Sequence, residues 1–322
     1  MKPLLRFVAK CILAALPFIL VGVFTLVAPL CYMDSEYPAW HYARKQAAAE
    51  QDAKVLVLGD SRAKADVMPA YFAEGGLNLA IGGATTIENY YTLKHYLEKN
   101  KPERIVILFA PFHYSSMDNF WQRTMYFNYL RVPETMEVFR EAKACSSDEV
   151  IRDGYVKDAF CDRTRVTSVY LPALMNAKFV GRYSANQQAL DELAAGDGHM
   201  LFGTADYCDD LNYEVNYEDM RESGDSELIG VYLKKLLDLC RENEISVIVA
   251  QPPMNEASYQ ELHEGYVRSF GYFMRSVQDL YPEITVETEI PCYGNEMFGD
   301  SSHLNRQGAE KFTEELVQKY HL

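Results

Sequence analysis

The chain has 322 residues, 48% of them hydrophobic, so it is long and apolar enough to fold around a core, and intrinsic disorder is excluded. Lysine and arginine number 31 against 46 aspartates and glutamates, which gives a formal net charge of −15. A chain this acidic repels phosphate groups, so nucleic acid is an unexpected partner, and electrostatic adhesion to anionic lipid is disfavoured.

The first predicted element is an uncharged run of 22 residues from Cys11 to Tyr32. A helix needs about 20 apolar residues to cross a bilayer, so the run predicts a single membrane span. Lys2, Arg6 and Lys10 precede it with no acidic residue, which predicts a cytoplasmic N-terminus and an extracytoplasmic remainder with a net charge of −18. The alternative is a cleaved signal peptide, whose apolar region is normally about 7 to 15 residues long and ends at a small-x-small site. Ala-Pro-Leu-Cys matches that site poorly.

Residues 33–53 are expected to form a short helical or irregular stalk. Three aromatic side chains here, Tyr32, Tyr37 and Trp40, are either an aromatic belt at the membrane interface or ordinary surface or core residues.

Alternating strand and helix patterns follow. The predicted strands are 55–58, 77–81, 104–110, 245–250 and 284–287, and the predicted helices are 86–100, 225–243, 257–280 and 305–320. This alternation predicts an α/β fold with a parallel sheet covered on both faces, and such sheets bind ligands at the carboxyl ends of their strands. Residues 111–223 show no clean period and are predicted to be an insertion or cap.

Five cysteines lie beyond the predicted span and contain no CxxC pair, so a metal site is poorly supported and no cofactor is indicated. Cys145 and Cys161 flank one polar segment and are the first candidates for a disulfide. Cys240 lies in a helical pattern and is expected to pack as a small apolar side chain.

The residues required for acyl transfer occur in a suitable order. Ser61 follows a predicted strand directly, where a tight turn presents its hydroxyl group. Asp300 and His303 are three residues apart on a turn before the last helix, so the acid can orient the imidazole toward Ser61. Gly83 ends the second strand, where its N–H can reach an oxyanion. Each motif alone also fits an ordinary turn or helix cap.

This set of motifs resembles the SGNH (GDSL-type) hydrolase superfamily. The first block matches residues 57–61, with Ser61 as nucleophile and its own N–H as an oxyanion donor. The second block matches residues 78–86, with Gly83 at the oxyanion glycine. The last block matches Asp300-Ser-Ser-His303 and continues through Gln307-Gly-Ala309 into the helix.

The resemblance covers about residues 54–110 and 225–320. It implies a three-layer αβα, flavodoxin-like domain at 33–322, interrupted by the insertion at about 111–223 and preceded by a membrane anchor at 1–32. It also implies Ser61, His303 and Asp300 as the catalytic triad.

One block departs from the family. The third strand of the family usually ends in Gly-x-Asn-Asp, whose Asn completes the oxyanion hole, whereas here residues 108–113 read LFAPFH. Loss of one such donor typically costs about 10²–10³ in rate. His113 is either the substitute donor or a structural histidine among aromatic neighbours.

The pattern looks like the anchored branch of the superfamily, which includes D-alanyl–lipoteichoic-acid transfer proteins and the SGNH proteins of exopolysaccharide acetylation. Those proteins work beside a multi-pass membrane O-acyltransferase. The resemblance therefore implies acyl transfer or ester cleavage on a cell-envelope glycopolymer through an acyl-Ser61 intermediate. The alternatives are an anchored or secreted esterase of carbohydrate or small esters, and a catalytically weak docking partner of a membrane O-acyltransferase.

Three further groups of residues could contribute to the site. Aromatic residues between Phe112 and Tyr129 either wall an acceptor groove or pack in the core of the insertion. Arg62 either binds an anionic substrate group or lies on the surface. Residues 251–254 (QPPM) leave a strand at the carboxyl edge and are expected to line the pocket.

Overall fold

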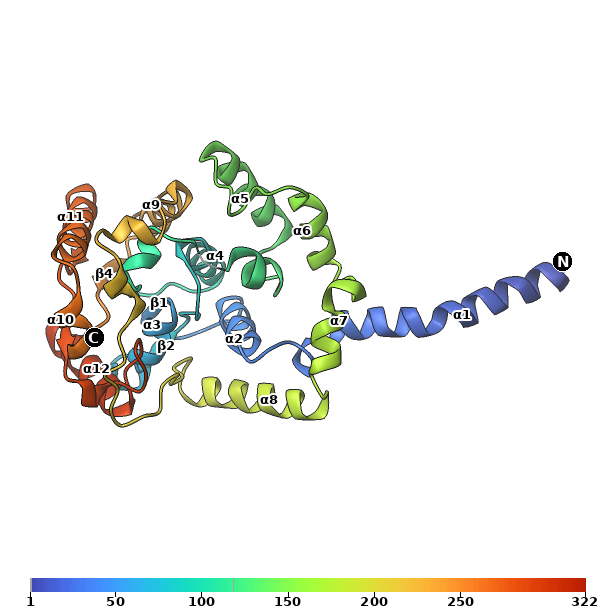
Figure 1. The fold of residues 1–322 in the computed structure, drawn as a ribbon, viewed down its shortest axis with the longest axis horizontal. Helices are drawn as coiled ribbons and strands as arrows, with labels where there is room; N and C mark the ends of the chain where they lie inside the picture. The colour runs from blue at the N-terminus through green and yellow to red at the C-terminus, as the bar shows by residue number, and fades with distance from the viewer. Residues whose placement is uncertain (1, 118) are drawn as a thin grey trace.

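The computed structural model describes residues 2–117 and 119–322 and contains one five-stranded parallel sheet (Figure 1). The strands occur in the order β2-β1-β3-β4-β6. Their bounds are Gly76–Asn78 (β2), Val55–Gly59 (β1), Arg104–Leu108 (β3), Ser246–Ala250 (β4) and Thr285–Val286 (β6). The predicted parallel α/β sheet is confirmed, although three strands end earlier than expected, at Asn78, Leu108 and Val286.

Helices cover both faces of this sheet because strand side chains alternate between them. Leu56 and Leu58 belong to a core formed with α4, α9 and α11, whereas Val55 and Val57 belong to a core formed with α3 and α12. These helices are Thr86–Tyr96 (α4), Glu227–Glu242 (α9), Glu264–Leu280 (α11), Ser61–Asp66 (α3) and Arg306–Tyr320 (α12). The sheet is therefore buried on both sides, and its strand ends are the exposed part of the fold.

The start of α4 is fixed by a capping box. The side chain of Glu88 accepts a hydrogen bond from the backbone N–H of Thr85 at 2.8 Å, and the Thr85 hydroxyl accepts one from the N–H of Ile87 at 3.3 Å. This cap directly follows the turn at Gly82 and Gly83, and the N–H of Ile81 before the turn donates to the carbonyl of Gly59 at the end of β1 at 3.1 Å.

The segment 111–223 is mainly helical, which its irregular residue pattern did not predict. Its longer helices are Val132–Ala144 (α5), Tyr155–Arg163 (α6), Thr167–Asn176 (α7) and Val180–Ala195 (α8). Phe120, Trp121, Phe127 and Tyr129 are buried in a core that this segment shares with α2 and α4. Packing in the core is thus the correct interpretation for these four aromatic side chains.

Shorter elements complete the chain. One-turn helices cover Pro29–Cys31, Pro69–Tyr71, Pro111–Tyr114, Phe120–Met125, Tyr213–Asn216, Met220–Ser223 and Asn295–Met297. The remaining elements are α10 (Glu256–Glu261) and the paired strands β5 (Met254–Asn255) and β7 (Cys292–Tyr293).

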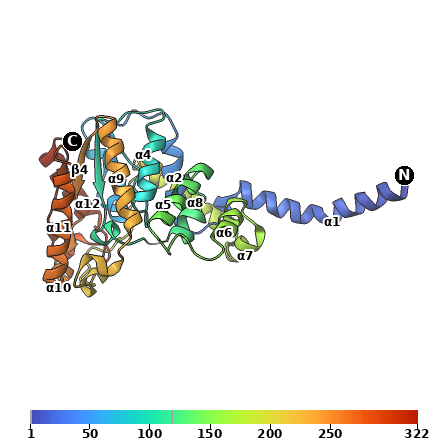
Figure 2. The same cartoon turned by 90° about the horizontal axis from the view of Figure 1, so that it is seen from above.

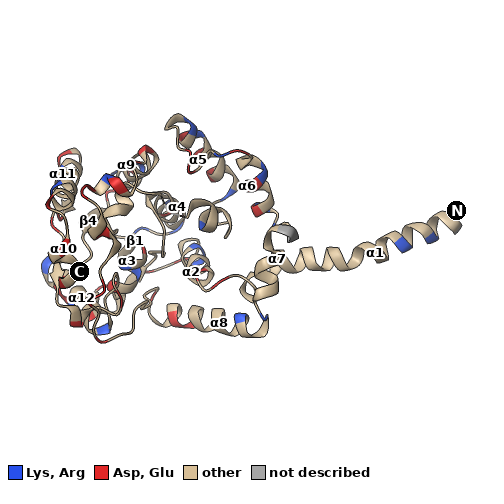
Figure 3. Cartoon of the chain, viewed as in Figure 1, with Lys and Arg blue, Asp and Glu red and all other residues tan. Residues whose placement is uncertain are grey.

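The N-terminal helix α1 (Lys2–Val27) extends away from the domain in both views (Figures 1 and 2). Its length and composition are sufficient to cross a membrane, and its charged residues lie only toward its N-terminus (Figure 3). The helix ends at Val27, so the last residues of the uncharged run leave it and pack against the domain.

The segment after α1 is not a stalk. Tyr37–Ala47 forms a helix (α2) whose side chains Tyr37 and Trp40 are buried, as is Tyr32 before it. These three aromatics belong to the same core as the buried aromatic residues of the insertion, so they do not form an interfacial belt.

All seven cysteines are free, so the predicted bond between Cys145 and Cys161 is not formed. Cys240 lies in α9 and is 1% exposed within the apolar core, as expected. Residues 251–254 are buried rather than lining a pocket, and the Gln251 side chain donates to the carbonyl of Glu287 at 3.0 Å.

Candidate active site

Ser61 is the first residue of α3 and stands at the carboxyl end of β1. The strand can turn there because Gly59 has φ +151 and a Cβ at that position would lie 1.8 Å from the carbonyl oxygen of Leu108. Asp60 then caps the helix by accepting a hydrogen bond from the N–H of Arg62 at 2.9 Å. Strand, glycine and cap together present the Ser61 side chain above the sheet.

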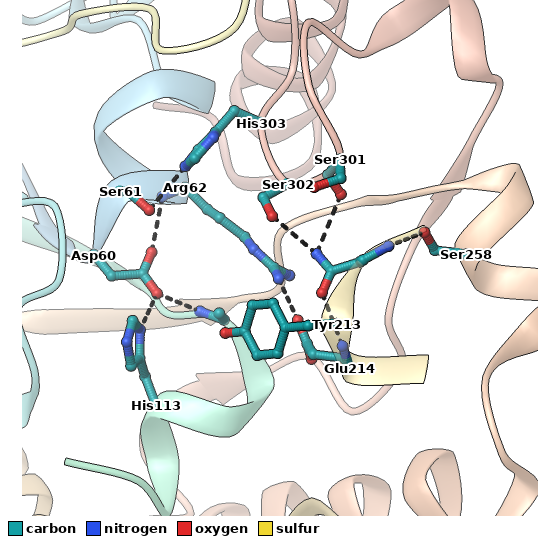
Figure 4. Close-up of polar contacts among 12 residues, drawn as sticks. Asp60, Ser61, Arg62, His113, Tyr213, Glu214, Ser258, Ser301, Ser302 and His303 are labelled. Atoms are coloured by element: carbon teal, nitrogen blue, oxygen red, sulfur yellow. Dashed lines mark hydrogen bonds and ion pairs between the residues drawn. The ribbon is translucent and has the colours of Figure 1, made fainter. Parts of the chain in front are cut away.

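Asp300 and His303 lie on the loop before α12, and the side chain of His303 points toward Ser61 (Figure 4). Nε2 of His303 lies 2.8 Å from Oγ of Ser61, and Nδ1 of His303 lies 2.9 Å from Oδ2 of Asp300. The loop is pinned because Oδ1 of Asp300 also accepts hydrogen bonds from the N–H groups of Ser302 and His303, each at 2.8 Å. The structure therefore brings the three predicted residues into one hydrogen-bonded chain.

The protonation of this chain follows from Asp300. Burial raises the pKa of its carboxyl group, but the hydrogen bond and charge of His303 and the two backbone N–H groups outweigh burial and leave the pKa lowered. An ionised Asp300 accepts the proton on Nδ1 of His303, so the lone pair on Nε2 faces the hydroxyl of Ser61. The His303 side chain is 15% exposed, so the group remains open to a substrate.

The turn at Gly82 and Gly83 supplies backbone donors beside the nucleophile. A Cβ at Gly82 would lie 3.7 Å from Cβ of Ser61, and Gly83 adopts the left-handed φ of +72. The N–H groups of both glycines donate to no acceptor among the described residues. Gly82 is thus next to Ser61, whereas the nearest atoms around the predicted residue Gly83 belong to Asn119 and Arg123.

Asn119 is a site residue that the sequence did not reveal. Its Nδ2 atom lies 3.5 Å from the position of a Cβ on Gly83, and its own backbone is left-handed with φ 62. Arg123 lies beside it and forms an ion pair with Glu36 at 3.3 Å. The insertion therefore brings an amide and a charged pair to the glycine turn.

His113 is directed at Asp60 rather than at the glycine turn. Its Nδ1 lies 2.5 Å from Oδ2 of Asp60, which also accepts the N–H of Ala110 at 2.7 Å. Burial raises the pKa of Asp60, but the hydrogen bond from His113 and the neighbouring charges hold it below its usual value. The only hydrogen bond of the His113 side chain to a described residue is thus to the cap of α3, which favours the structural one of its two interpretations.

Arg62 is a buried residue rather than a surface residue, and its guanidinium group is paired within the protein. It is 2% exposed and forms an ion pair with Glu214, which also accepts the hydroxyl of Tyr266. Asn212, two residues before Glu214, donates through Nδ2 to the carbonyl of Ser301 at 3.2 Å and contacts the hydroxyl of Ser302 at 3.1 Å (Figure 4). One short segment of the insertion therefore supports both the nucleophile helix and the Asp300–His303 loop.

Asp66, at the other end of α3, provides a second link between these parts. Its Oδ1 accepts the N–H of Leu304 at 3.1 Å, and its backbone carbonyl accepts the hydroxyl of Thr313 at 3.2 Å. Burial raises the pKa of the Asp66 carboxyl well above its usual value. The residue after His303 is thus tied to the helix that begins with Ser61.

An aromatic side chain also borders the site. The ring of Phe202 lies 5.0 Å from the imidazole of His303 between centroids, and its edge would lie 3.6 Å from a Cβ on Gly82. Phe202 is partly exposed. It lies outside the group of aromatic residues between Phe112 and Tyr129, for which an acceptor groove was one of two interpretations.

The chain matches no protein-family model, and no curated protein matches it.

Proposed function

We propose that this chain is a serine acyltransferase or esterase of the SGNH type, anchored to the membrane by α1. The observation that carries the proposal is the hydrogen-bonded chain from Asp300 through His303 to Ser61. A nucleophile, a base and an acid that orients the base are the groups that acyl transfer at neutral pH requires.

The strand order supports the same assignment. The sheet order β2-β1-β3-β4-β6 corresponds to the 2-1-3-4-5 order of flavodoxin-like folds, in which ligands bind where the order reverses beside the first strand. Ser61 follows β1, and Gly82 and Gly83 follow β2. The order reverses between β1 and β3, so the proposed nucleophile lies at the edge of that reversal, and the backbone donors lie on the neighbouring strand β2.

In the first half-reaction, Oγ of Ser61 attacks the carbonyl carbon of an ester while its proton passes to Nε2 of His303. The N–H groups of Ser61 and the glycine turn stabilise the oxyanion, and we propose the side-chain amide of Asn119 as a third donor. The tetrahedral intermediate then breaks its bond to the leaving alcohol, which takes the proton from His303. The product of this step is acyl-Ser61.

In the second half-reaction, His303 removes a proton from an acceptor hydroxyl, which attacks acyl-Ser61. The C–O bond to Ser61 breaks, and the proton returns to Oγ. With a sugar hydroxyl as acceptor the reaction is transfer, and with water it is hydrolysis. The partly exposed ring of Phe202 beside His303 favours a sugar acceptor, because sugar rings stack on aromatic side chains.

We further propose that the acceptor is a glycopolymer of the cell envelope and that the domain lies on the extracytoplasmic side. The positive charges that precede α1 support this orientation. A multi-pass membrane O-acyltransferase is the proposed source of acyl groups. These assignments follow the resemblance of residues 57–61, 78–86 and 300–305 to the SGNH motifs.

Labelling with a fluorophosphonate tests the proposal. The full-length protein in detergent should acquire one adduct, located on Ser61 by peptide mass spectrometry. Ser61→Ala should abolish the adduct. Ser301→Ala is the matched control, because it removes a nearby hydroxyl group that does not contact His303. This variant should be labelled as the unaltered protein is. An adduct that persists in Ser61→Ala would reject the nucleophile.

A further inference from the structure

The helix α7 and the start of α8 present large apolar side chains to solvent. Leu171, Met175, Phe179 and Val180 are 47%, 74%, 47% and 83% exposed. We call residues 171–183 the α7–α8 corner. Aromatic and aliphatic side chains grouped in this way on a surface mark a contact with a partner or with a membrane.

This corner lies against the membrane-anchor helix. Leu171, Met175 and Phe179 line a cavity of about 510 Å³ together with Leu20 and Phe24 of α1. The rings of Phe24 and Phe179 meet edge to face with centroids 5.6 Å apart. Figures 1 and 2 both show α7 beside the end of α1 that meets the domain. The corner is therefore level with the last third of the helix.

The length of α1 indicates how deep in the bilayer the α7–α8 corner lies. From Cys11, after the last basic residue, to Val27 the helix has 17 residues. They span about 25 Å at 1.5 Å per residue, which is less than the hydrocarbon thickness of about 30 Å. The hydrocarbon must then extend along α1 to Val27. Leu20 and Phe24 lie about 5–10 Å below Val27 along the helix axis, which places the side chains packed against them inside the hydrocarbon.

The charge of this segment fits the same location. Residues 163–190 contain four basic residues and no aspartate or glutamate, in a chain with 46 acidic residues. Lys178 is exposed and Arg182 is half-buried, and both flank the apolar positions Phe179 and Val180. Basic side chains beside inserted apolar ones are typical of interfacial segments, because their cationic ends reach lipid phosphates.

We infer that the α7–α8 corner is a second membrane contact, which inserts Met175, Phe179 and Val180 into the leaflet beside α1 and binds lipid phosphates through Lys178 and Arg182. The inference rests on the part of the proposed function in which α1 spans the membrane. Two contacts, one spanning and one interfacial, restrict rotation of the domain about α1. The site at Ser61 then keeps a constant orientation and height relative to the bilayer.

Photo-crosslinking to lipid tests the inference. The full-length protein is placed in nanodiscs of phosphatidylcholine and phosphatidylglycerol that contain a phospholipid with a diazirine on its acyl chain. After irradiation, peptide mass spectrometry locates the crosslinked residues. We expect lipid adducts on α1 and on the α7–α8 corner. The exposed apolar residues Tyr272 and Leu280 of α11 are the internal control and should remain unlabelled.

Two double variants distinguish the membrane contact of the α7–α8 corner from that of the anchor helix α1. Met175→Asp with Val180→Asp should lose the adducts on the corner and keep those on α1, because both side chains are more than two-thirds exposed and the fold does not need them. Tyr272→Asp with Leu280→Asp should leave both sets of adducts unchanged. Lipid adducts on α1 alone in the unaltered protein would reject the α7–α8 corner as a second membrane contact, while α1 would still be supported as the membrane anchor. Adducts on neither segment would overturn the anchor as well.

Discussion

Nε2 of His303 lies 2.8 Å from Oγ of Ser61, although 242 residues separate them in the chain. Both residues begin or precede a helix at the same edge of the sheet, and Asp66 of α3 bonds to the residue that follows His303. The contact is therefore held by two helices and the strand beneath them. This rigidity is what a nucleophile and its base need, because catalysis depends on their mutual orientation.

The role of Asp300 is tested by Asp300→Asn, with Asp153→Asn on the exposed surface as the control. An amide can donate rather than accept at Nδ1, which favours the wrong tautomer of His303 and lowers kcat by about 10⁴-fold. Rates of adduct formation with a fluorophosphonate, measured by intact mass, report the effect. Equal rates in the two variants would show that Asp300 does not orient the base.

The role of His113 is tested by His113→Ala. Its removal leaves the buried Asp60 carboxylate without that partner and should lower the free energy of unfolding by about 3–5 kcal/mol. Replacing both residues, as in Asp60→Asn with His113→Ala, should recover part of this loss because no buried charge remains. Thermal denaturation of the two variants and of the unaltered protein gives the comparison. Unchanged stability with a large fall in kcat would instead make His113 an oxyanion donor.

Asn119→Ala tests the proposed third donor. Loss of one oxyanion donor typically lowers kcat by about 10²–10³-fold. Asn216→Ala, which removes an exposed amide bonded to the carbonyl of Tyr213, is the matched control. Hydrolysis of p-nitrophenyl acetate and labelling of Ser61 are the two readouts. If Asn119→Ala matches the control, the hole has only its backbone donors, and small activated esters should be poor substrates of the unaltered protein.

A pH dependence of stability is expected from Lys64, which is buried in α3 and donates to the carbonyl of Gly198 at 2.8 Å. Burial lowers the pKa of Lys64 from its ordinary value of 10.5 to about 7. Between these two values the unfolded chain binds more protons than the folded one, so the free energy of unfolding rises with pH in this window and is constant below it.

The Lys64 contribution between pH 7 and pH 9 is about 2 kcal/mol. Lys64→Met should therefore show a smaller rise in Tm over this interval than the unaltered protein. Lys157→Met, on the exposed face of α6, should show the same rise as the unaltered protein. Parallel curves for all three proteins would mean that Lys64 stays charged in the folded state up to pH 9.

Much of the sheet and the position of the three central residues could be predicted from the sequence. Apolar runs such as 55–58 are short and end at glycine, which identifies strands and their exit turns, and carboxyl ends of parallel strands meet at one edge. Ser61 and His303 therefore had to approach one another once both were placed at that edge.

The rest of the site depends on contacts that no local pattern encodes. Phe202, Asn119 and Glu214 all come from the segment 111–223, whose helices bury aromatic side chains against α2 and α4 instead of showing a simple period. The partner of Arg62 could not be identified because it is 152 residues away in the chain. The supposed stalk was misassigned since Trp40 is covered by residues of the same insertion.

The most direct test of the account is to trap the acyl-enzyme. The full-length protein is mixed with an activated acyl donor, quenched in acid after seconds and digested, and peptide mass spectrometry locates the added acyl group. If the reaction proceeds through acyl-Ser61, we expect the acyl mass on Ser61 and its absence in Ser61→Ala. The unaltered protein should lose the acyl group when an acceptor glycopolymer is added. An acyl group carried by another residue, or turnover of the donor that continues in Ser61→Ala, would contradict it.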